Sequence, residues 1–176
     1  VFRYYKGLSY LLEAMQWVPA TLLLVGGGPL ETELRAQGER LGLADRVRFA
    51  GRVSDKGLPA YYHAADLFVL PSCERSEAYG LAQVEAMAAG LPVVGTELGT
   101  GTTFVNRHGE TGLVVPPKDP RALADAINAL LGDEALCRRL ALGARQRAQA
   151  LSAERMTAAV EDVYRAALAG SEREQR

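Results

Sequence analysis

The chain has 176 residues, of which 48% are hydrophobic and 23% are charged, a composition typical of a folded globular domain rather than a disordered segment. Twenty Lys and Arg residues against 21 Asp and Glu leave a formal net charge of −1, which argues against a dedicated nucleic-acid-binding domain. No apolar run approaches the roughly 20 residues that cross a bilayer. The two cysteines, Cys73 and Cys137, lie far apart, which indicates a reducing compartment and no structural zinc site.

Short apolar runs alternate with helical patterns through the first two thirds of the chain. Strands are predicted at residues 21–25, 47–51, 66–70, 92–95 and 112–115, and helices between them at 7–17, 30–41, 58–65 and 80–89. Because the strand runs are almost continuously apolar, they indicate a parallel sheet buried on both faces. The predicted fold class is therefore α/β, with a Rossmann-like, doubly wound parallel sheet.

Both ends of the chain depart from this alternation. A loop and a helix precede the first predicted strand, whereas a doubly wound sheet is built outward from a central first strand. We therefore expect the first strand to be missing and the chain to be a fragment of a longer protein. After Pro120, helices are predicted at 121–131, 133–151 and 153–168, with Asp133 and Ser152 as N-caps and a frayed tail over 170–176.

A glycine-rich segment, Gly26-Gly27-Gly28-Pro29, follows the first predicted strand. Glycine lets a backbone approach a ligand, and the N-terminus of the next helix favours phosphate. A tight strand-to-helix turn explains the same residues equally well. The spacing is not G-x-G-x-x-G, the next strand ends in Gly51-Arg52 without an acidic residue, and no P-loop motif occurs. NAD and P-loop nucleotide binding are therefore disfavoured.

A longer polar loop, residues 71–80, links the third predicted strand to the helix that begins near Gly80. Ligands of open α/β sheets bind outside the carboxyl ends of the strands, and free N–H groups at Gly80 and Leu81 would face an anion. Glu77 lies in the loop and Glu85 eight residues later in the helix, where carboxylates could hold sugar hydroxyls. The alternative is that Glu85 is an ordinary charge on the helix surface and that Glu77 interacts only with the dipole at the helix N-terminus.

The segment EAYGLAQVEAMAAGLPVV, residues 77–94, resembles the E-x7-E signature of family 4 retaining glycosyltransferases. Further motifs keep that family's order along the chain: Tyr4-Tyr5-Lys6-Gly7, Gly26-Gly27-Gly28-Pro29, Gly51-Arg52-Val53-Ser54, and residues 65–72 and 109–116. The resemblance extends to about Leu168. It implies the C-terminal, donor-binding half of a two-domain GT-B enzyme, with residues 1–176 forming the nucleotide-sugar domain and helices 121–168 closing it.

By this resemblance Glu77 and Lys6 are the catalytic candidates, Glu77 toward the transferred sugar and Lys6 toward the pyrophosphate, while Glu85 holds the donor ribose. The resemblance assigns the rest of the donor site to Arg3, Gly27, Gly28, Arg52, Val53, Tyr79, Gly80 and Leu81. One departure concerns the family's pyrophosphate arginine, whose position falls on Val1. Either Arg3 takes its place or the arginine was lost upstream.

The implied reaction is transfer of a hexose from a nucleotide-diphosphate sugar, such as GDP-mannose or a UDP-hexose, to an acceptor hydroxyl with retention. No D-x-D motif or histidine cluster offers a metal site, so neither metal nor cofactor is expected. The expected partners are the sugar donor and an N-terminal acceptor-binding domain, without nucleic acid. Membrane contact is expected only through the missing domain, at a cytoplasmic location, and the fragment alone is expected to be inactive.

Two other functions fit parts of the pattern. A nucleotide-sugar epimerase or phosphorylase of the same architecture would share the pyrophosphate site, and a non-catalytic nucleotide-binding module would not need Glu77. Other residues have no special prediction: His63 and His108 are expected to be structural or on the surface. Residues 98–103 either reach the sugar or form a flexible Gly/Thr loop. The helix over 153–168 either crosses back to the N-terminal domain, as in the family, or packs ordinarily.

Overall fold

Each predicted apolar run forms a strand in the computed structural model, which describes residues 1–174 and side chains through residue 168. The strands are β1 (Leu22–Val25), β2 (Val47–Gly51), β3 (Phe68–Leu70), β4 (Val93–Thr96) and β5 (Gly112–Val115). All three strand pairings are parallel. The chain is therefore an α/β domain with parallel strands, as the sequence predicts.

The strands form two groups instead of one continuous sheet. β1 pairs with β2, with Leu22 opposite Val47, while β3, β4 and β5 form a second group in that order. In the doubly wound order 3-2-1-4-5-6, an absent first strand would lie between the strands that correspond to β1 and β3. The interruption therefore occurs where the sequence leads us to expect a missing strand.

An apolar cavity of about 790 Å³ lies between the two groups of strands. The cavity is lined by β1 and β3, which lie on opposite sides of the interruption, together with Phe2 and Leu11. Leu23 of β1 is 40% exposed, which is unusual for leucine in a parallel strand. One more parallel strand would cover these side chains and pair the facing strand edges. That a segment preceding Val1 supplies it stays a prediction.

Helices pack on both faces of the sheet. The two neighbouring residues Val93 and Val94 of β4 point to opposite faces, and each joins a different hydrophobic core. The first core is closed by α1 (Leu8–Ala14), α2 (Glu31–Arg40) and α6 (Pro120–Gly132), and the second by α4 (Leu81–Ala88), α5 (Gly101–Val105) and α7 (Glu134–Ala150). The short helix α3 (Leu58–His63) leads into β3, and 3₁₀ turns at Tyr4–Lys6 and Met15–Trp17 flank α1.

Acidic and hydroxyl side chains fix the starts of the C-terminal helices. The Asp133 carboxylate accepts a 2.9 Å hydrogen bond from the Leu136 N–H at the start of α7, and Ser152 Oγ accepts one from Arg155 N–H at 3.4 Å. Both predicted N-caps are thus confirmed. Asp119 caps α6 in the same way, through a 2.9 Å hydrogen bond from Ala122 N–H.

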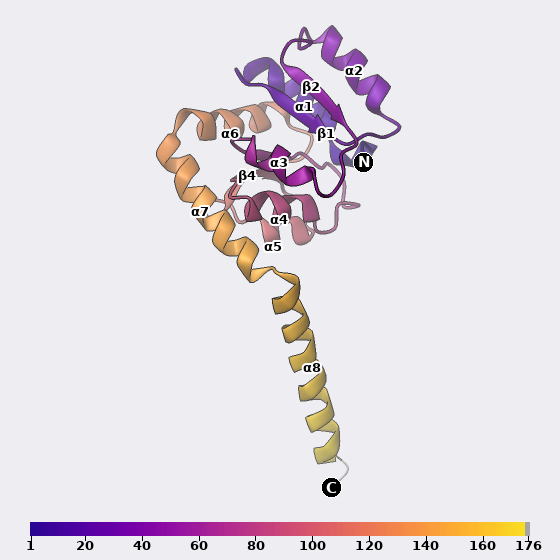
Figure 1. The fold of residues 1–176 in the computed structure, drawn as a ribbon, viewed down its shortest axis with the longest axis vertical. Helices are drawn as coiled ribbons and strands as arrows, with labels where there is room; N and C mark the ends of the chain where they lie inside the picture. Colours follow the sequence, from indigo (N-terminus) through magenta and orange to yellow (C-terminus); the bar gives the residue numbers. More distant parts are fainter. Residues whose placement is uncertain (175–176) are drawn as a thin grey trace.

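The last helix, α8 (Ala153–Glu174), projects away from the rest of the domain (Figure 1). Its apolar side chains Met156, Val160 and Val163 are 65%, 48% and 68% exposed, so an ordinary packed helix on this domain is the wrong alternative. The helix also extends past its predicted end at Leu168, because Ser, Glu and Arg continue it through 174 without a proline. The predicted frayed tail thus overlaps α8 over residues 170–174, its fraying stays a prediction, and residues 175 and 176 lie outside the described residues. None of the described helices combines the length and hydropathy needed to cross a membrane.

Candidate functional site

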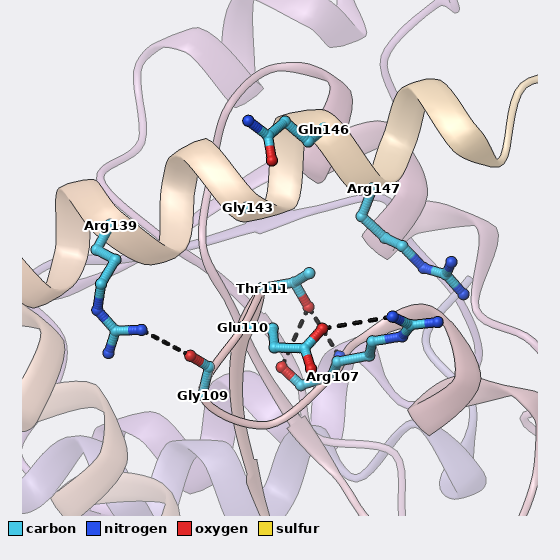
Figure 2. A pocket seen from close by; sticks show the side chains of 8 residues that line it. All are labelled: Arg107, Gly109, Glu110, Thr111, Arg139, Gly143, Gln146 and Arg147. Atoms are coloured by element: carbon cyan, nitrogen blue, oxygen red, sulfur yellow. Dashed lines mark hydrogen bonds and ion pairs between the residues drawn. The ribbon is translucent and has the colours of Figure 1, made fainter.

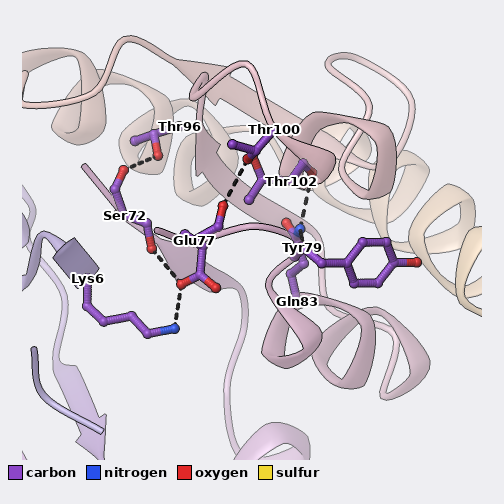
Figure 3. A network of polar contacts seen from close by, with 8 residues as sticks. All are labelled: Lys6, Ser72, Glu77, Tyr79, Gln83, Thr96, Thr100 and Thr102. Atoms are coloured by element: carbon purple, nitrogen blue, oxygen red, sulfur yellow. Dashed lines mark hydrogen bonds and ion pairs between the residues drawn. The ribbon is translucent and has the colours of Figure 1, made fainter. Parts of the chain in front are cut away.

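The candidate site lies at the carboxyl ends of the parallel strands, where the loops after β1, β2, β3 and β4 meet. Glu77, in the loop after β3, is its most enclosed charge, with an exposed fraction of 7%. Lys6 Nζ forms an ion pair with Glu77 Oε2, and Ser72 Oγ donates a 3.0 Å hydrogen bond to the same oxygen (Figure 3). The carboxylate is therefore held in one orientation without a ligand.

Two threonines fix the backbone on either side of this carboxylate. Thr100 Oγ1 donates to the Glu77 carbonyl at 2.9 Å, and Thr96 Oγ1 donates to the Ser72 carbonyl (Figure 3). Thr100 precedes α5, so this segment is ordered and contacts the candidate site, and the prediction of a flexible loop is wrong. The segment carrying Glu77 is therefore fixed by side chains at the end of β4 and in the loop that follows it.

A close backbone approach brings Lys6 to Glu77 across 71 residues of sequence. Gly7 has a φ of +65°, and a Cβ there would stand 1.9 Å from the Pro71 carbonyl oxygen, so only glycine fits. The Cys73 N–H donates a 2.8 Å hydrogen bond to the Tyr5 carbonyl. The turn before α1 is thus attached directly to the loop after β3.

The N-terminus of α4 presents backbone N–H groups at the same edge of the sheet. Gly80 is its N-cap, with a φ of +73° and no capping side chain. Gln83 Nε2 fixes this turn through hydrogen bonds to the carbonyls of Tyr79 (2.8 Å) and Thr102 (3.1 Å). The first N–H groups of a helix lack intrahelical acceptors, so those around Gly80 and Leu81 can receive an anion.

Glu85, one turn further along α4, is exposed and differs from Glu77 in its contacts. Tyr62 Oη of α3 donates a 2.8 Å hydrogen bond to Glu85 Oε2. Burial, followed by the hydrogen bond to Glu85 and its charge, raises the pKa of Tyr62, so the phenol stays a neutral donor. Glu85 Oε1 accepts no hydrogen bond from the described residues, which leaves it available to a ligand.

The glycine segment after β1 has a packing role. A Cβ on Gly28 would stand 2.6 Å from both the N and the O atom of Phe2, and the Phe2 N–H donates to the Gly27 carbonyl at 3.0 Å. Glycine is therefore needed at position 28 for close packing against the N-terminal segment. The Arg52 side chain lies beside Gly27, whose Cβ position is 3.6 Å from Arg52 Cγ. Donor contacts of Gly27, Gly28, Arg52 and the half-buried Val53 stay predictions.

Cations gather near the start of the chain. The charges of Lys6, Arg52 and Arg3 all lie within electrostatic range of the first residue, as does that of Glu77. Arg3 is exposed, and within residues 1–168 its side chain forms no hydrogen bond or ion pair. Arg3 thus contributes positive potential, but no contact attaches it to Glu77.

Tyr79 does not join the group formed by Lys6 and Glu77. Its ring points away from both and packs against the second core, beside Met87 (Figure 3). A donor contact by this ring stays a prediction that its packing does not support.

Histidines have ordinary surroundings: His63 is exposed, and His108 Nδ1 accepts a 3.0 Å hydrogen bond from Val114 N–H. Among the described residues, no group of three His, Cys, Asp or Glu side chains is placed to hold a metal ion.

A second hollow, of about 440 Å³, lies between α7 and the loop before β5 (Figure 2). It is at the amino end of β5, opposite the edge that carries Glu77. Its arginines already have acceptors: Arg139 donates to the Gly109 carbonyl at 2.8 Å, and Arg107 pairs with Glu110 at 3.4 Å. Arg147 donates to the Phe104 carbonyl at 2.7 Å. These contacts attach α7 to neighbouring segments and leave the carboxyl-end site as the candidate.

Sequence reasoning missed Tyr62, Ser72 and Thr96 as parts of the site, whereas Thr100 lies in the segment 98–103 that it named as able to reach the sugar. Ser72 had a local signal, because it directly follows a predicted strand at the ligand-binding edge. Tyr62 and Thr96 reach their partners only through tertiary packing, over sequence separations of 23 and 24 residues. No spacing rule could have identified them.

The sequence matches the family described as glycosyl transferases group 1 over residues 1–147. Among curated proteins, the D-rhamnosyltransferase WbpZ of Pseudomonas aeruginosa is 47% identical over 130 residues, which cover 74% of this chain and 34% of that protein. The O-antigen chain mannosyltransferase C of Escherichia coli is 37% identical over 164 residues, 93% of this chain and 44% of that protein. The chain thus spans less than half the length of these two relatives.

Solved structures share the fold. The sucrose-phosphate synthase of Thermosynechococcus elongatus superposes with a TM-score of 0.81 at 37% identity, over 96% of this chain and 44% of that chain. The C-terminal domain of the group 1 glycosyl transferase LpcC from Francisella tularensis gives 0.75 at 26% identity, over 84% of this chain and 80% of that domain. Anabaena HepE in complex with UDP-glucose gives 0.75 at 31% identity, over 84% of this chain and 41% of that chain.

Proposed function

This chain belongs to the glycosyl transferases group 1 family and has the fold of its C-terminal GT-B domain, and from that premise we propose that it binds the nucleotide-diphosphate sugar of a retaining hexosyltransferase. The observation that carries the proposal is the joining of Lys6, Glu77 and the N-terminus of α4 at one edge of the sheet. Relatives named as mannosyl- and rhamnosyltransferases support a hexose as the transferred group, and the UDP-glucose complex of HepE supports a nucleotide-diphosphate sugar as donor.

In this proposal the departing diphosphate is stabilised by positive charge. The ammonium of Lys6 has three donors, so it can keep Glu77 with one and bind a phosphate oxygen with another. The free N–H groups at Gly80 and Leu81 and the dipole of α4 act on the same negative charge. The bond between the anomeric carbon and the diphosphate oxygen breaks while the acceptor oxygen bonds to that carbon on the same face, and the O–H bond of the acceptor breaks as its proton passes to the departing diphosphate oxygen.

The two carboxylates have separate tasks. Glu77, fixed by Lys6 and Ser72, accepts hydrogen bonds from the transferred sugar, and Glu85 accepts from the ribose hydroxyls. Such contacts orient the donor, and orientation of reactants contributes a large part of the catalysis of a bimolecular transfer. Neither carboxylate forms a covalent bond to the sugar in this proposal.

The acceptor belongs, in this proposal, to an N-terminal domain at a cytoplasmic location, where that domain makes any membrane contact. The apolar stripe of α8, formed by Met156, Val160, Val163 and Ala167, is exposed and faces no other part of the described domain. It is suited to pack on that second domain. The isolated chain would then bind donor without transferring sugar, and measurable transfer by residues 1–176 alone would contradict this division of labour.

Calorimetric titration with GDP, UDP, ADP and NAD tests donor binding. The titration uses this chain together with the residues that its gene encodes upstream, which we call the extended protein. The same protein with Glu85→Ala is titrated beside it. We expect one nucleoside diphosphate to bind selectively and Glu85→Ala to weaken it by about 1–3 kcal/mol, the cost of a lost charged hydrogen bond. Glu33→Ala, which removes an exposed glutamate from α2, is the matched control. Binding of no nucleotide, or binding indifferent to Glu85, would count against the proposal.

A comparison of the free nucleotide with its sugar conjugate separates the transferase from a nucleotide-binding module. With Glu77→Gln, we expect binding of the nucleoside diphosphate to persist and the extra affinity from the hexose to disappear. A module that does not use the sugar would show the same ratio in wild type and variant. A glycoside product, detected with the extended protein, separates the transferase from an epimerase or phosphorylase.

A further inference from the structure

Tyr62 connects helix α3 to the candidate ribose carboxylate on α4. Its ring packs edge-on against Phe68 of β3, with centroids 6.0 Å apart and an interplanar angle of 62°. Its hydroxyl donates to Glu85 Oε2 at 2.8 Å and lies 3.4 Å from the Ala82 carbonyl of the same helix. The phenol is thus fixed at the ring by the strand and at the hydroxyl by α4.

The hydrogen bond from Tyr62 restricts the conformations that the Glu85 side chain can adopt. A glutamate on an exposed helix surface normally samples several rotamers, and binding a ligand then costs the entropy of choosing one. Here one carboxylate oxygen is engaged by a neutral donor, and the other accepts no hydrogen bond from the described residues. Because the raised pKa of Tyr62 keeps the phenol protonated, this arrangement holds at neutral pH.

We propose that Tyr62 is a positioning residue that holds Glu85 ready for the vicinal hydroxyls of the donor ribose. The inference rests on the proposed donor-binding function and adds a residue that acts through Glu85 without touching the donor. Glu85 is exposed and only its Oε2 is engaged by Tyr62, so the carboxylate is open to a ligand while the phenol supports it. Recognition of ribose, as opposed to deoxyribose, therefore depends on the phenol.

The test is Tyr62→Phe in the extended protein, because phenylalanine keeps the ring against Phe68 and removes only the hydroxyl. The ligands are the nucleoside diphosphate that wild type binds best and its 2′,3′-dideoxy analogue, with dissociation constants measured by calorimetry. We expect Tyr62→Phe to bind the ribonucleotide roughly 3- to 10-fold more weakly, as for one lost hydrogen bond, and the dideoxy analogue unchanged. The melting temperature checks that the variant is folded.

The neighbouring tyrosine supplies the matched control. Tyr61 precedes Tyr62 in α3, and its hydroxyl makes no hydrogen bond to any described residue, so Tyr61→Phe should leave both dissociation constants unchanged. In a Glu85→Ala background, Tyr62→Phe should cause no further loss, because its effect passes through Glu85.

Four results would overturn the inference. Equal weakening of the ribonucleotide and the dideoxy analogue by Tyr62→Phe would indicate general disturbance of the site. A loss that persists in the Glu85→Ala background would place the effect elsewhere. If wild type prefers the ribonucleotide and Tyr62→Phe keeps the same preference, the positioning role is refuted and the donor site stands. If wild type binds no nucleotide, the donor site is refuted as well.

Discussion

The two glutamates of the site are held in different ways. Glu77 is 7% exposed and has an ion pair to Lys6, a hydrogen bond from Ser72 and a fixed backbone carbonyl. Glu85 is exposed and is held by Tyr62 alone. The buried carboxylate is part of the folded framework, so its loss affects stability and chemistry together. The exposed carboxylate can change affinity with little effect on folding.

The largest expected effect follows from breaking the ion pair on the Glu77 side. Lys6→Met leaves Glu77 buried without its countercharge and removes the cation proposed to face the diphosphate. We expect a loss of roughly 2–4 kcal/mol in unfolding free energy, toward the lower end because Lys6 is partly exposed. We also expect a fall of about 100-fold or more in transfer by the extended protein. Urea unfolding and a donor-turnover assay measure the two effects.

Lys56→Met is the control for this variant, because Lys56 is exposed and has no ion pair within the described part of the chain. It should change neither quantity appreciably. If Lys6→Met kept wild-type turnover, the lysine would be a structural partner of Glu77 and no more.

A smaller effect is expected at the start of α4, between the two glutamates. Gly80 and Gly90 both have left-handed φ angles, +73° and +87°, so alanine is strained at either position. A Cβ at Gly80 would also stand 2.7 Å from Leu70 Cδ2, whereas nothing lies within 4 Å of one at Gly90. Gly90→Ala should cost about 1 kcal/mol, and Gly80→Ala about 1 kcal/mol more.

Only Gly80→Ala should weaken diphosphate binding, by roughly 10-fold, because it displaces the helix N-terminus. Calorimetry on both variants checks this expectation. Equal binding losses in the two variants would mean that the N-terminus of α4 does not receive the diphosphate.

Local sequence signals predicted most of the fold. Continuous apolar runs located all five strands, and Asp133 and Ser152 were recognised as caps because a cap acts on N–H groups two or three residues away. The sequence predicts that the last helix ends at Leu168, six residues before α8 does, because Gly170 is typical of a helix end. Helix α5 was missed because a five-residue helix rich in Gly and Thr has no clear periodicity.

The site was predicted only where sequence spacing or family resemblance applied. Glu77 and Glu85 lie eight residues apart in one motif, and Lys6 entered through the resemblance alone. The contacts between Lys6 and Glu77, and between Tyr62 and Glu85, depend on how loops and helices from distant parts of the chain are brought together. Hydrophobic periodicity says which face of an element is buried, and it does not say which polar side chain meets which.

The smallest expected effect concerns pH on the Glu85 side. The pKa of Tyr62 is raised in the folded protein, first by burial and then by Glu85, while an unfolded tyrosine ionises at about pH 10. Below pH 10 the stabilisation from the protonated phenol is complete. As the pH rises further, the unfolded state releases a proton that the folded state keeps, so stability falls.

Between pH 9 and pH 11, wild type should lose roughly 1 kcal/mol more unfolding free energy than Tyr62→Phe, since other titrating groups are common to both. Urea unfolding at the two pH values measures this difference. Parallel losses in wild type and Tyr62→Phe would mean that the phenol is not held by Glu85 in solution, and the contrast between the two glutamates would then rest on Glu77 alone.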